Sequence, residues 1–376
     1  MTVANRKLLT LFFSFIVWLK KMKILITAPS LDETVNVSGI STLVREIINN
    51  SREEFSHFTA GRKDGEKAGI GWIFNQIVLP VQFLRKIRRE KPDLVHINTA
   101  FVPLSIMRDA SFVFVSRFAK TPVLLHPNGG RFLIEDFKNK FLEKIAAKML
   151  RSASKILVLS DIEKENLTRR WKDLDIEILP NAISIDETLS AKEVPQRKTI
   201  LFLGRIHESK GLHEIIEACK TLVKENFEFD FKCFGTGPEK DFFVGEMQKV
   251  LGKNFHYGGV IAGEEKRREL VKADIFLLPS RYGEGLPLAM LEAMAARCVP
   301  VVADVASVRA VIKNGENGFL VEPYSAEQTT ENLRNLLSDK VDWKFLSENA
   351  RQTVKDNYSI ADYVEKLGEI YRKISE

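Results

Sequence analysis

The sequence of 376 residues has only three cysteines, no apolar run long enough to cross a bilayer, and no internal repeat. Cys219, Cys233 and Cys298 lie far apart and form no Cys-x-x-Cys pair, so neither a disulfide framework nor a zinc site is expected. The lack of a period of about 20 to 50 residues argues against a solenoid. Because free cysteines persist in a reducing compartment, we predict a cytoplasmic location.

One shorter apolar stretch lies near the N-terminus, at residues 8–19, between basic residues. It is too short to span a bilayer, which needs about 20 apolar residues, and no small-residue cleavage site follows it. Two interpretations remain: residues 1–21 form a shallow membrane anchor, or Met22 is the true start. We favour the second, because MKILITAP reads as the first strand of an α/β domain.

The net charge of +6 is unevenly distributed along the chain. Residues 1–190 carry 29 Lys and Arg against 21 Asp and Glu, a balance of +8, whereas residues 191–376 have a balance of −2. A basic N-terminal half suits a surface that meets phospholipid or a phosphorylated substrate. Nucleic acid is not an expected partner, because no basic–aromatic pattern or known reader motif is present.

Short apolar runs alternate with longer amphipathic segments, which is typical of parallel sheets with helices on both faces. The expected strands lie at 23–29, 93–98, 122–127, 155–160 and 176–181 and, after a polar stretch, at 199–204, 229–235, 254–259, 275–280, 299–304 and 318–323.

We therefore predict two doubly wound α/β domains, at residues 22–185 and 186–355, joined near 182–196. The closing segment, 356–376, has the apolar stripe of a helix and is expected to pack across the domain junction. Ligands of open parallel sheets bind beyond the carboxyl ends of the strands, so two facing sheets predict a cleft between the domains.

The segment GRIHESKGL, at 204–212, follows an expected strand and opens an expected helix. Arg205 and Lys210 would lie on the connecting loop beside a helix N-terminus, where two cations can hold a diphosphate. The segment is neither a Walker loop nor a Gly-x-Gly-x-x-Gly motif. Taken alone, it fits a pair of solvated surface cations equally well.

The segment EGLPLAMLE, at 284–292, places a carboxylate at each end of an apolar stretch. Because Pro is favoured in the first turn of a helix and Gly disrupts one, we expect a helix from about Pro287, with Glu284 on the preceding loop. Glu292 would lie inside that helix, where a buried carboxylate needs a partner such as a ligand hydroxyl.

The start of the same expected helix also supplies backbone donors. The free N–H groups of Gly285 and Leu286 would face an anion in the cleft. The alternative for the whole segment is an ordinary helix with one exposed Glu and a second Glu on a loop.

Together these segments resemble the retaining glycosyltransferases of family four, which have the GT-B fold of two facing Rossmann-like domains. The family's mark is two glutamates separated by seven residues, with Gly-Phe/Leu-Pro after the first. Similar segments lie at 38–47 (SGISTLVREI), 91–98 (KPDLVHIN), 179–183 (LPNAI) and 314–323 (NGENGFLVEP). The resemblance covers roughly Met22 to the C-terminus, and the combination is far more specific than any one segment.

The resemblance implies a role for each charged residue of the two segments. Glu284 would lie beside the donor sugar, and Glu292 would accept hydrogen bonds from the ribose hydroxyls of the nucleotide. Arg205 and Lys210 would bind the diphosphate and stabilise it as it leaves.

The resemblance also implies roles for three residues outside these pairs. Gly39 would allow the backbone to approach a phosphate closely, and Val260 would contact the base through its backbone. His126 matches a histidine that contacts the sugar or the acceptor, and we favour this role over a structural one because it follows a strand. For His96 we favour a structural role.

Two positions depart from the family pattern, since Ser38 and Ala182 stand where glycine is usual. Both changes are conservative in size, and they leave the identity of the donor open. Asp173 and Asp175 have the Asp-x-Asp form that holds metal in another glycosyltransferase fold, but here they lie in a polar turn. We expect no metal and no cofactor, because Arg205 and Lys210 supply the positive charge.

The activity implied by the resemblance is transfer of a hexose-type sugar, with retention, from a UDP- or GDP-linked donor to a hydroxyl of a saccharide or lipid-linked acceptor. Such a reaction suits surface polysaccharide biosynthesis, such as that of lipopolysaccharide or capsule. The basic run at 85–91 is either a solvated helix end or a peripheral contact with anionic membrane. The alternatives are a sugar-nucleotide epimerase of the same fold and a catalytically silent partner, and product formation would separate them.

Overall fold

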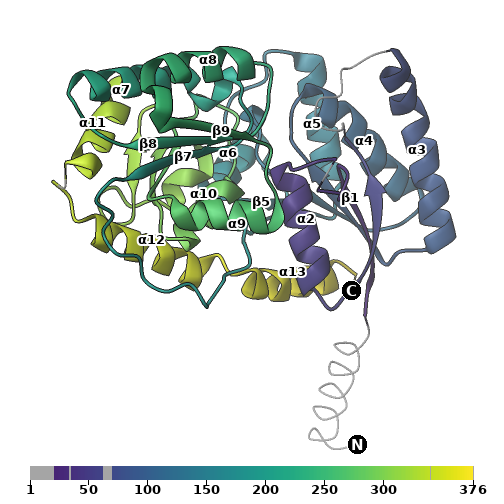
Figure 1. Ribbon diagram of the computed structural model, residues 1–376. Coiled ribbons are helices and arrows are strands. Elements are labelled where there is room, and N and C mark those ends of the chain that lie inside the picture. The colour runs from purple at the N-terminus through teal and green to yellow at the C-terminus, as the bar shows by residue number, and fades with distance from the viewer. Residues whose placement is uncertain (1–20, 34, 62–69, 339, 376) are drawn as a thin grey trace, which may run out of the picture.

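The computed structural model describes residues 21–33, 35–61, 70–338 and 340–375, so the prediction of an anchor within residues 1–21 lies almost wholly outside the described residues. The described residues form two parallel sheets of six strands each, which lie side by side with helices around them (Figure 1). This doubly wound arrangement confirms the predicted fold class.

The first sheet has the strand order β2-β1-β3-β4-β5-β6, and the second has the order β12-β11-β10-β7-β8-β9. The strands of the first sheet are β1 (Lys23–Ala28), β2 (Glu54–Thr59), β3 (Leu94–Thr99), β4 (Val123–Pro127), β5 (Lys155–Val158) and β6 (Ile176–Ile178). Those of the second are β7 (Thr199–Leu203), β8 (Asp230–Phe234), β9 (Phe255–Gly259), β10 (Ile275–Leu278), β11 (Val299–Ala303) and β12 (Phe319–Val321).

Helices connect successive strands and cover the faces of the sheets. Those before β7 are α2 (Gly39–Asn50), α3 (Ile70–Glu90), α4 (Pro103–Phe118), η1 (Arg131–Leu133), α5 (Lys140–Ser152) and α6 (Asp161–Arg170). Those after β7 are η2 (Glu208–Lys210), α7 (Leu212–Lys224), α8 (Lys240–Leu251), η3 (Gly252–Asn254), α9 (Gly263–Lys272), α10 (Leu288–Ala295), η4 (Ala306–Ala310), α11 (Ala326–Leu337), α12 (Trp343–Asn357) and α13 (Ile360–Ser375).

Strand β2 is the one strand of the first sheet that the sequence pattern does not predict. Its sequence, EFSHFT, has four polar residues, and five of its six residues are only half-buried or exposed. The strand lies at the edge of the sheet, where one side has no partner strand. An edge position reduces burial, so the apolar run that marks the inner strands is missing.

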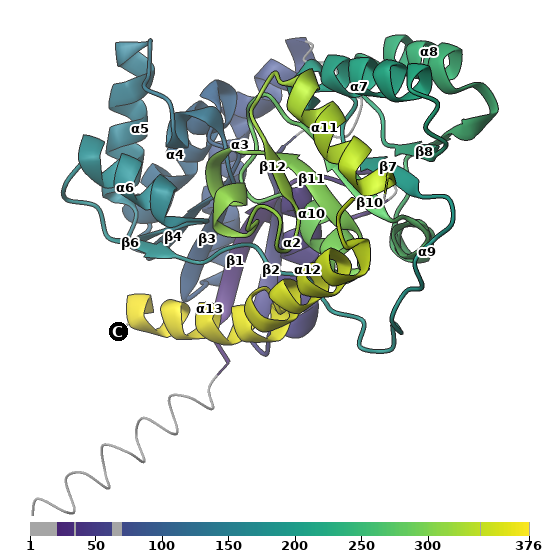
Figure 2. The same cartoon turned by 90° about the vertical axis from the view of Figure 1, so that its left-hand side faces the viewer.

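The C-terminal helix α13 leaves the second domain and packs against the first, beside α2, β3 and β4 (Figure 2). The two chain crossings between the domains run side by side: Ile183 N–H donates to the Tyr358 carbonyl at 3.0 Å, and Ile360 N–H donates to the Ile183 carbonyl at 2.9 Å. Arg372 of α13 forms an ion pair of 2.6 Å with the buried Glu53. The C-terminus is therefore anchored on the N-terminal domain.

The apolar core is continuous across the junction between the sheets. One cluster of buried side chains includes Leu43 and Leu124 of the first domain together with Leu286 and Leu291 of the second. Within the described part of the chain, no helix has both the length and the apolar character to cross a membrane.

Candidate active site

The two predicted diphosphate-binding residues follow β7, at its carboxyl end. Lys210, in the short turn η2, forms an ion pair with the carboxylate of Glu284. Glu284 also accepts a hydrogen bond of 2.7 Å from the hydroxyl of Ser280. Arg205 is exposed, and its guanidinium has no partner among the described residues, so it is available to an anion.

The loop that carries Lys210 is held against the loop that carries Glu284. Gly211 has a φ of +72°, and a Cβ at this position would lie 2.0 Å from the Pro279 carbonyl oxygen, so only glycine fits. The Arg281 N–H donates to the Ser209 carbonyl at 2.8 Å, and the Arg281 guanidinium pairs with Glu214 at 2.8 Å. These contacts position the Lys210 ammonium beside Glu284.

The N-terminus of α10 leaves backbone donors free at the same place. Pro287 is the N-cap of this helix, as the sequence predicts within one residue. Gly285 and Leu286 are buried, and in the described part of the chain their N–H groups have no hydrogen-bond partner. Buried N–H groups at the start of a helix favour an anion beside them.

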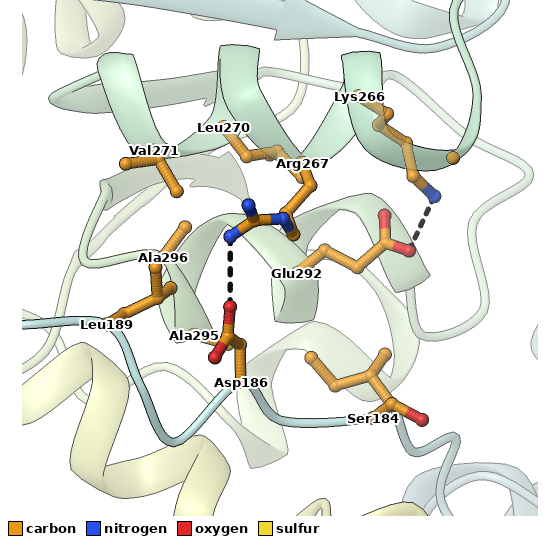
Figure 3. Close-up of a pocket in the computed structure, with 12 residues that line it drawn as sticks. Ser184, Asp186, Leu189, Lys266, Arg267, Leu270, Val271, Glu292, Ala295 and Ala296 are labelled. Atoms are coloured by element: carbon orange, nitrogen blue, oxygen red, sulfur yellow. Dashed lines mark hydrogen bonds and ion pairs between the residues drawn. The ribbon is translucent and has the colours of Figure 1, made fainter.

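Glu292 lies one turn into α10 and pairs with Lys266 of α9, with 2.6 Å between Oε1 and Nζ (Figure 3). Its side chain is 18% exposed, so it is neither fully buried nor solvated. It borders a cavity of about 140 Å³ between the linker and helices α9 and α10. The Glu292 carboxylate is thus open on one side, where a ligand hydroxyl could reach it.

Val260 lies between β9 and α9, at the start of the segment that carries Lys266, and its side chain is half-exposed. Gly39 begins α2 in the first domain, capped by the Ser38 side chain. A Cβ on Gly39 would meet no protein atom within 4 Å. Packing within the protein therefore does not require glycine there, and space remains for a ligand.

The first domain meets the site through the loop after β4. A Cβ on Gly129, whose φ is +102°, would lie 2.7 Å from the backbone nitrogen of Gly285. Asn181 donates from its side-chain amide to the Leu286 carbonyl at 2.7 Å. The two domains therefore touch backbone to backbone at the Glu-Gly-Leu-Pro turn.

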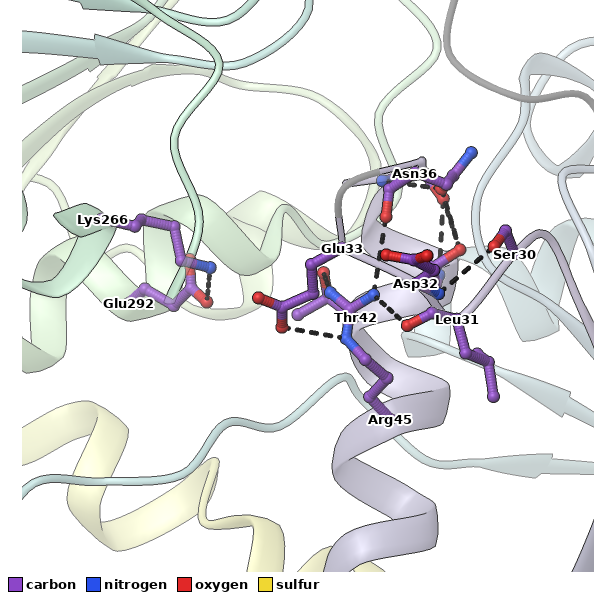
Figure 4. A network of polar contacts seen from close by, with 11 residues as sticks. Ser30, Leu31, Asp32, Glu33, Asn36, Thr42, Arg45, Lys266 and Glu292 are labelled. Carbon is purple, nitrogen blue, oxygen red and sulfur yellow. Dashed lines mark hydrogen bonds and ion pairs between the residues drawn. The ribbon is translucent and has the colours of Figure 1, made fainter. Parts of the chain in front are cut away.

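A second contact between the domains forms around the loop after β1 (Figure 4). Glu33 pairs with Arg45 of α2 at 3.2 Å and lies against the start of α9, 3.8 Å from where a Cβ of Gly263 would be. Asn36 accepts from the Ser38 N–H at 3.0 Å and from the Ser41 hydroxyl at 2.9 Å. This network fixes the loop that leads into Gly39.

His126 is the second-to-last residue of β4 and is fully buried, and burial lowers its pKa to about 3. Its Nδ1 lies 3.3 Å from Nε2 of His96, and its own Nε2 has no partner among the described residues. Burial, followed by the charge of His126, lowers the pKa of His96 well below its usual value. Both imidazoles are therefore neutral at pH 7.

No group of three or more metal-ligating side chains occurs among the described residues. Asp175 of the Asp-x-Asp sequence pairs with Lys155 at 2.8 Å. The expectation that no metal or cofactor is needed stays a prediction.

Comparison with known proteins decides the family. Residues 186–353 match the model described as glycosyl transferases group 1, and residues 69–187 match the model described as glycosyltransferase family 4. This chain is a family-four glycosyltransferase with the GT-B fold. The resemblance stated from the motifs is thereby confirmed.

Relatives of this glycosyltransferase are distant but cover most of its length. It is 24% identical to an α-D-kanosaminyltransferase of Streptomyces kanamyceticus, over 81% of this chain and 83% of the relative. It is also 24% identical to an Escherichia coli enzyme named UDP-Gal:α-D-GlcNAc-diphosphoundecaprenol α-1,3-galactosyltransferase, over 77% of this chain and 78% of the relative.

A solved structure with a similar fold is Anabaena HepE in complex with UDP-glucose, with a TM-score of 0.73 and 16% identity. The match covers 94% of this glycosyltransferase and all of the HepE chain. At this identity the likeness shows the shared fold.

The structure brings together most of the predicted site residues and adds others. Lys210, Glu284, Gly285 and Leu286 share one cluster of loops, whereas Glu292 lies beside Lys266 further along α10. The contacts that Lys266, Asn181 and Gly129 make at the site were not predicted from the sequence. Asn181 lies in a segment that resembles the family pattern, at 179–183. The spacing of residues along the sequence gave no reason to select Lys266 or Gly129.

Proposed function

We propose that this glycosyltransferase moves a hexose-type sugar from a nucleotide diphosphate sugar to a hydroxyl of a saccharide or lipid-linked acceptor, with retention at the anomeric carbon. The observation that carries the proposal is the cluster at the carboxyl ends of β7 and β10. There Lys210 pairs with Glu284, and the N–H groups of Gly285 and Leu286 directly follow it. Arg205 lies on the loop that leads to Lys210, and its guanidinium has no partner among the described residues.

Each group in this cluster suits one part of such a donor. Arg205, Lys210 and the N–H groups would hold the diphosphate and stabilise its charge as it leaves. Glu284 would accept from a sugar hydroxyl, and Glu292 would accept from the ribose in place of Lys266. His126 would contact the sugar or the acceptor, and Gly39 and Val260 would meet the phosphate and the base through their backbones.

The donor would be linked to UDP or GDP and the acceptor would be of the surface-polysaccharide type, and the relatives support the UDP-linked form. The name of the Escherichia coli relative includes UDP-galactose and a diphosphoundecaprenol-linked sugar, and HepE is in complex with UDP-glucose. We propose a cytoplasmic location for the reaction. All three cysteines lie in the described part of the chain, where they are buried and unpaired, as suits a reducing compartment.

The first experiment is calorimetric titration of the protein with UDP and with GDP, followed by assay of the matching nucleotide sugars. We expect one nucleotide to bind and Lys210→Ala to abolish that binding. Transfer should slow about a hundred- to a thousand-fold, because about 2–4 kcal/mol of charge stabilisation is lost.

Lys232→Ala is the matched control, because Lys232 pairs with Glu269 at 2.6 Å in the same domain but outside the site. It should leave binding and transfer unchanged. Little loss in Lys210→Ala would contradict the diphosphate assignment. Nucleotide binding without any sugar transfer would point to the silent binding partner, and conversion of the sugar nucleotide itself would point to an epimerase.

We propose further that the outer face of α3 contacts anionic membrane, where a lipid-linked acceptor would lie. This helix lies at the edge of the first domain, away from the second (Figure 1). Its exposed side chains are apolar at Ile77, Val78 and Val81 and basic at Arg85 and Arg88. Neither arginine has a partner among the described residues, so both charges are available to phospholipid.

Vesicles containing phosphatidylserine or phosphatidylglycerol test this surface by co-sedimentation. We expect the protein to bind them and the double variant Arg85→Gln/Arg88→Gln to lose about 2 kcal/mol of binding free energy, roughly 1 kcal/mol for each charge. Lys253→Gln/Lys344→Gln removes two exposed charges from the second domain and should bind as the unaltered protein does. Equal binding of all three would reject α3 as the contact.

A further inference from the structure

Three buried side chains form a hydrogen-bonded chain from the C-terminal helix to the histidine at the end of β4. The Tyr371 hydroxyl lies 2.8 Å from Nδ1 of His96, and Nε2 of His96 lies 3.3 Å from Nδ1 of His126. The two rings are nearly parallel, with 20° between their planes, and all three residues are fully buried. The last atom of the chain, Nε2 of His126, has no partner in the described part of the protein.

The open end of this chain lies on the side of the first sheet that faces the second domain. Side chains alternate along β4, and Leu124 packs into the core that crosses the junction, whereas Leu125 packs into the core on the other face. His126 is two residues after Leu124, so its side chain lies on the same face of the sheet as that of Leu124. It is three residues from Gly129, which touches Gly285.

The tyrosine determines the direction of the hydrogen bonds. Within the described residues the Tyr371 hydroxyl has a single partner, Nδ1 of His96. If His96 donated from Nδ1, the phenolic proton would be buried without an acceptor, which is costly. Tyr371 therefore donates, and His96 accepts at Nδ1.

A neutral imidazole carries its proton on one nitrogen and accepts with the other. His96 then carries its proton on Nε2 and donates to Nδ1 of His126. His126 in turn carries its proton on Nε2, so its free ring nitrogen is a hydrogen-bond donor.

We propose that Tyr371 is a positioning residue for sugar transfer: through His96 it fixes His126 as the Nε2–H tautomer, which donates to an oxygen of the donor sugar or the acceptor. The inference rests on the proposed function, because it takes His126 to be a sugar or acceptor contact. It gives the C-terminal helix, which is remote in sequence, a part in the site.

The variant Tyr371→Phe removes the donor and keeps the ring. Tyr363→Phe is the matched control, because Tyr363 is buried on the same helix and its hydroxyl has no partner in the described part of the chain. Thermal unfolding of both variants checks that each is folded before any other measurement.

The first readout is the ¹⁵N spectrum of the histidine rings in the full chain without substrate, assigned with His96→Asn and His126→Asn. We expect His126 to show protonated Nε2 and bare Nδ1 in the unaltered protein and in Tyr363→Phe. In Tyr371→Phe a second tautomer of His126 should appear, because without the tyrosine donor neither direction of the hydrogen bond between His96 and His126 is favoured. An unchanged His126 spectrum in Tyr371→Phe would overturn the proposal.

The second readout is kinetic. We expect kcat of Tyr371→Phe to fall about two- to tenfold, as the loss of one oriented hydrogen bond allows, with nucleotide affinity unchanged. A shifted tautomer with unchanged kcat would overturn the role in transfer. Failure of the unaltered protein to bind any nucleotide would instead refute the proposed function, and calorimetry would reveal it separately from the ring spectra.

Discussion

Both glutamates of the Glu-x7-Glu motif have a lysine as partner. Glu284 pairs with Lys210, which follows β7, and Glu292 pairs with Lys266 of α9. The ion pairs orient the two carboxylates, whose side chains are no more than 18% exposed. We propose that donor binding would exchange these partners: the diphosphate would take Lys210 and the ribose hydroxyls would take Glu292, so little new desolvation would be needed.

The buried imidazoles make stability depend on pH in a definite direction. His126 has a folded pKa of about 3, whereas an unfolded histidine has one of about 6.5. Between these values the unfolded chain binds a proton that the folded chain does not, so stability falls as pH falls. Each such ring contributes about 1.4 kcal/mol per pH unit, and His96 acts in the same direction.

Glu163 opposes this trend, because burial raises its pKa to about 7. Its folded form binds a proton that the unfolded form releases, so it stabilises the fold as pH falls from 7 towards 5. Urea midpoints between pH 5.0 and 6.5 should therefore decrease with falling pH, and Glu163→Gln should steepen the decrease. His126→Asn should reduce the slope of stability against pH by about 1.4 kcal/mol per pH unit, the contribution of one proton. An unchanged slope in that variant would contradict the lowered pKa of His126.

At the scale of elements, the turn before α10 depends on contact with the loop after β4. Gly129 and Gly285 approach so closely that a side chain on either would collide with the backbone of the other domain. The turn that presents Glu284 therefore belongs to a junction, and its geometry depends on how the domains meet.

Replacing Gly129 with alanine should disturb this junction, because it adds a collision to a backbone with a φ of +102°. We expect about 1–3 kcal/mol of destabilisation of the contact and a larger radius of gyration by small-angle X-ray scattering. Gly245→Ala is the control: Gly245 lies in α8 with nothing within 4 Å, so alanine should stabilise the protein by about 0.5–1 kcal/mol. Unchanged scattering and activity in Gly129→Ala would reject the junction as a requirement.

The sequence predicts the elements well wherever burial leaves a clear mark. Eleven of the twelve strands in the described residues follow from apolar runs, and α10 begins within one residue of the proline that predicts it. The edge strand β2 was not predicted, because its half-exposed positions carry no apolar run. Spacing along the chain also located Glu284 and Glu292, since both lie on one continuous segment.

What the sequence could not predict are contacts between distant segments. Tyr371 and His96 are 275 residues apart, and neither belongs to a pattern that mentions the other. The same holds for Asn181 and Leu286, which are 105 residues apart. Such pairs depend on how two domains are placed, which local periodicity does not encode.

For the whole molecule, the two chain crossings between the domains are bonded to each other at Ile183 and Ser359. Because the two crossings are bonded side by side, we expect them to resist twisting and sliding of one domain relative to the other. Bending about a line through both crossings is then the easiest relative motion of the domains. Entry or release of a substrate would then open the cleft by bending one domain away from the other. Because α13 packs against the first domain, which also contains His96, the Tyr371–His96 contact should persist at every angle of opening.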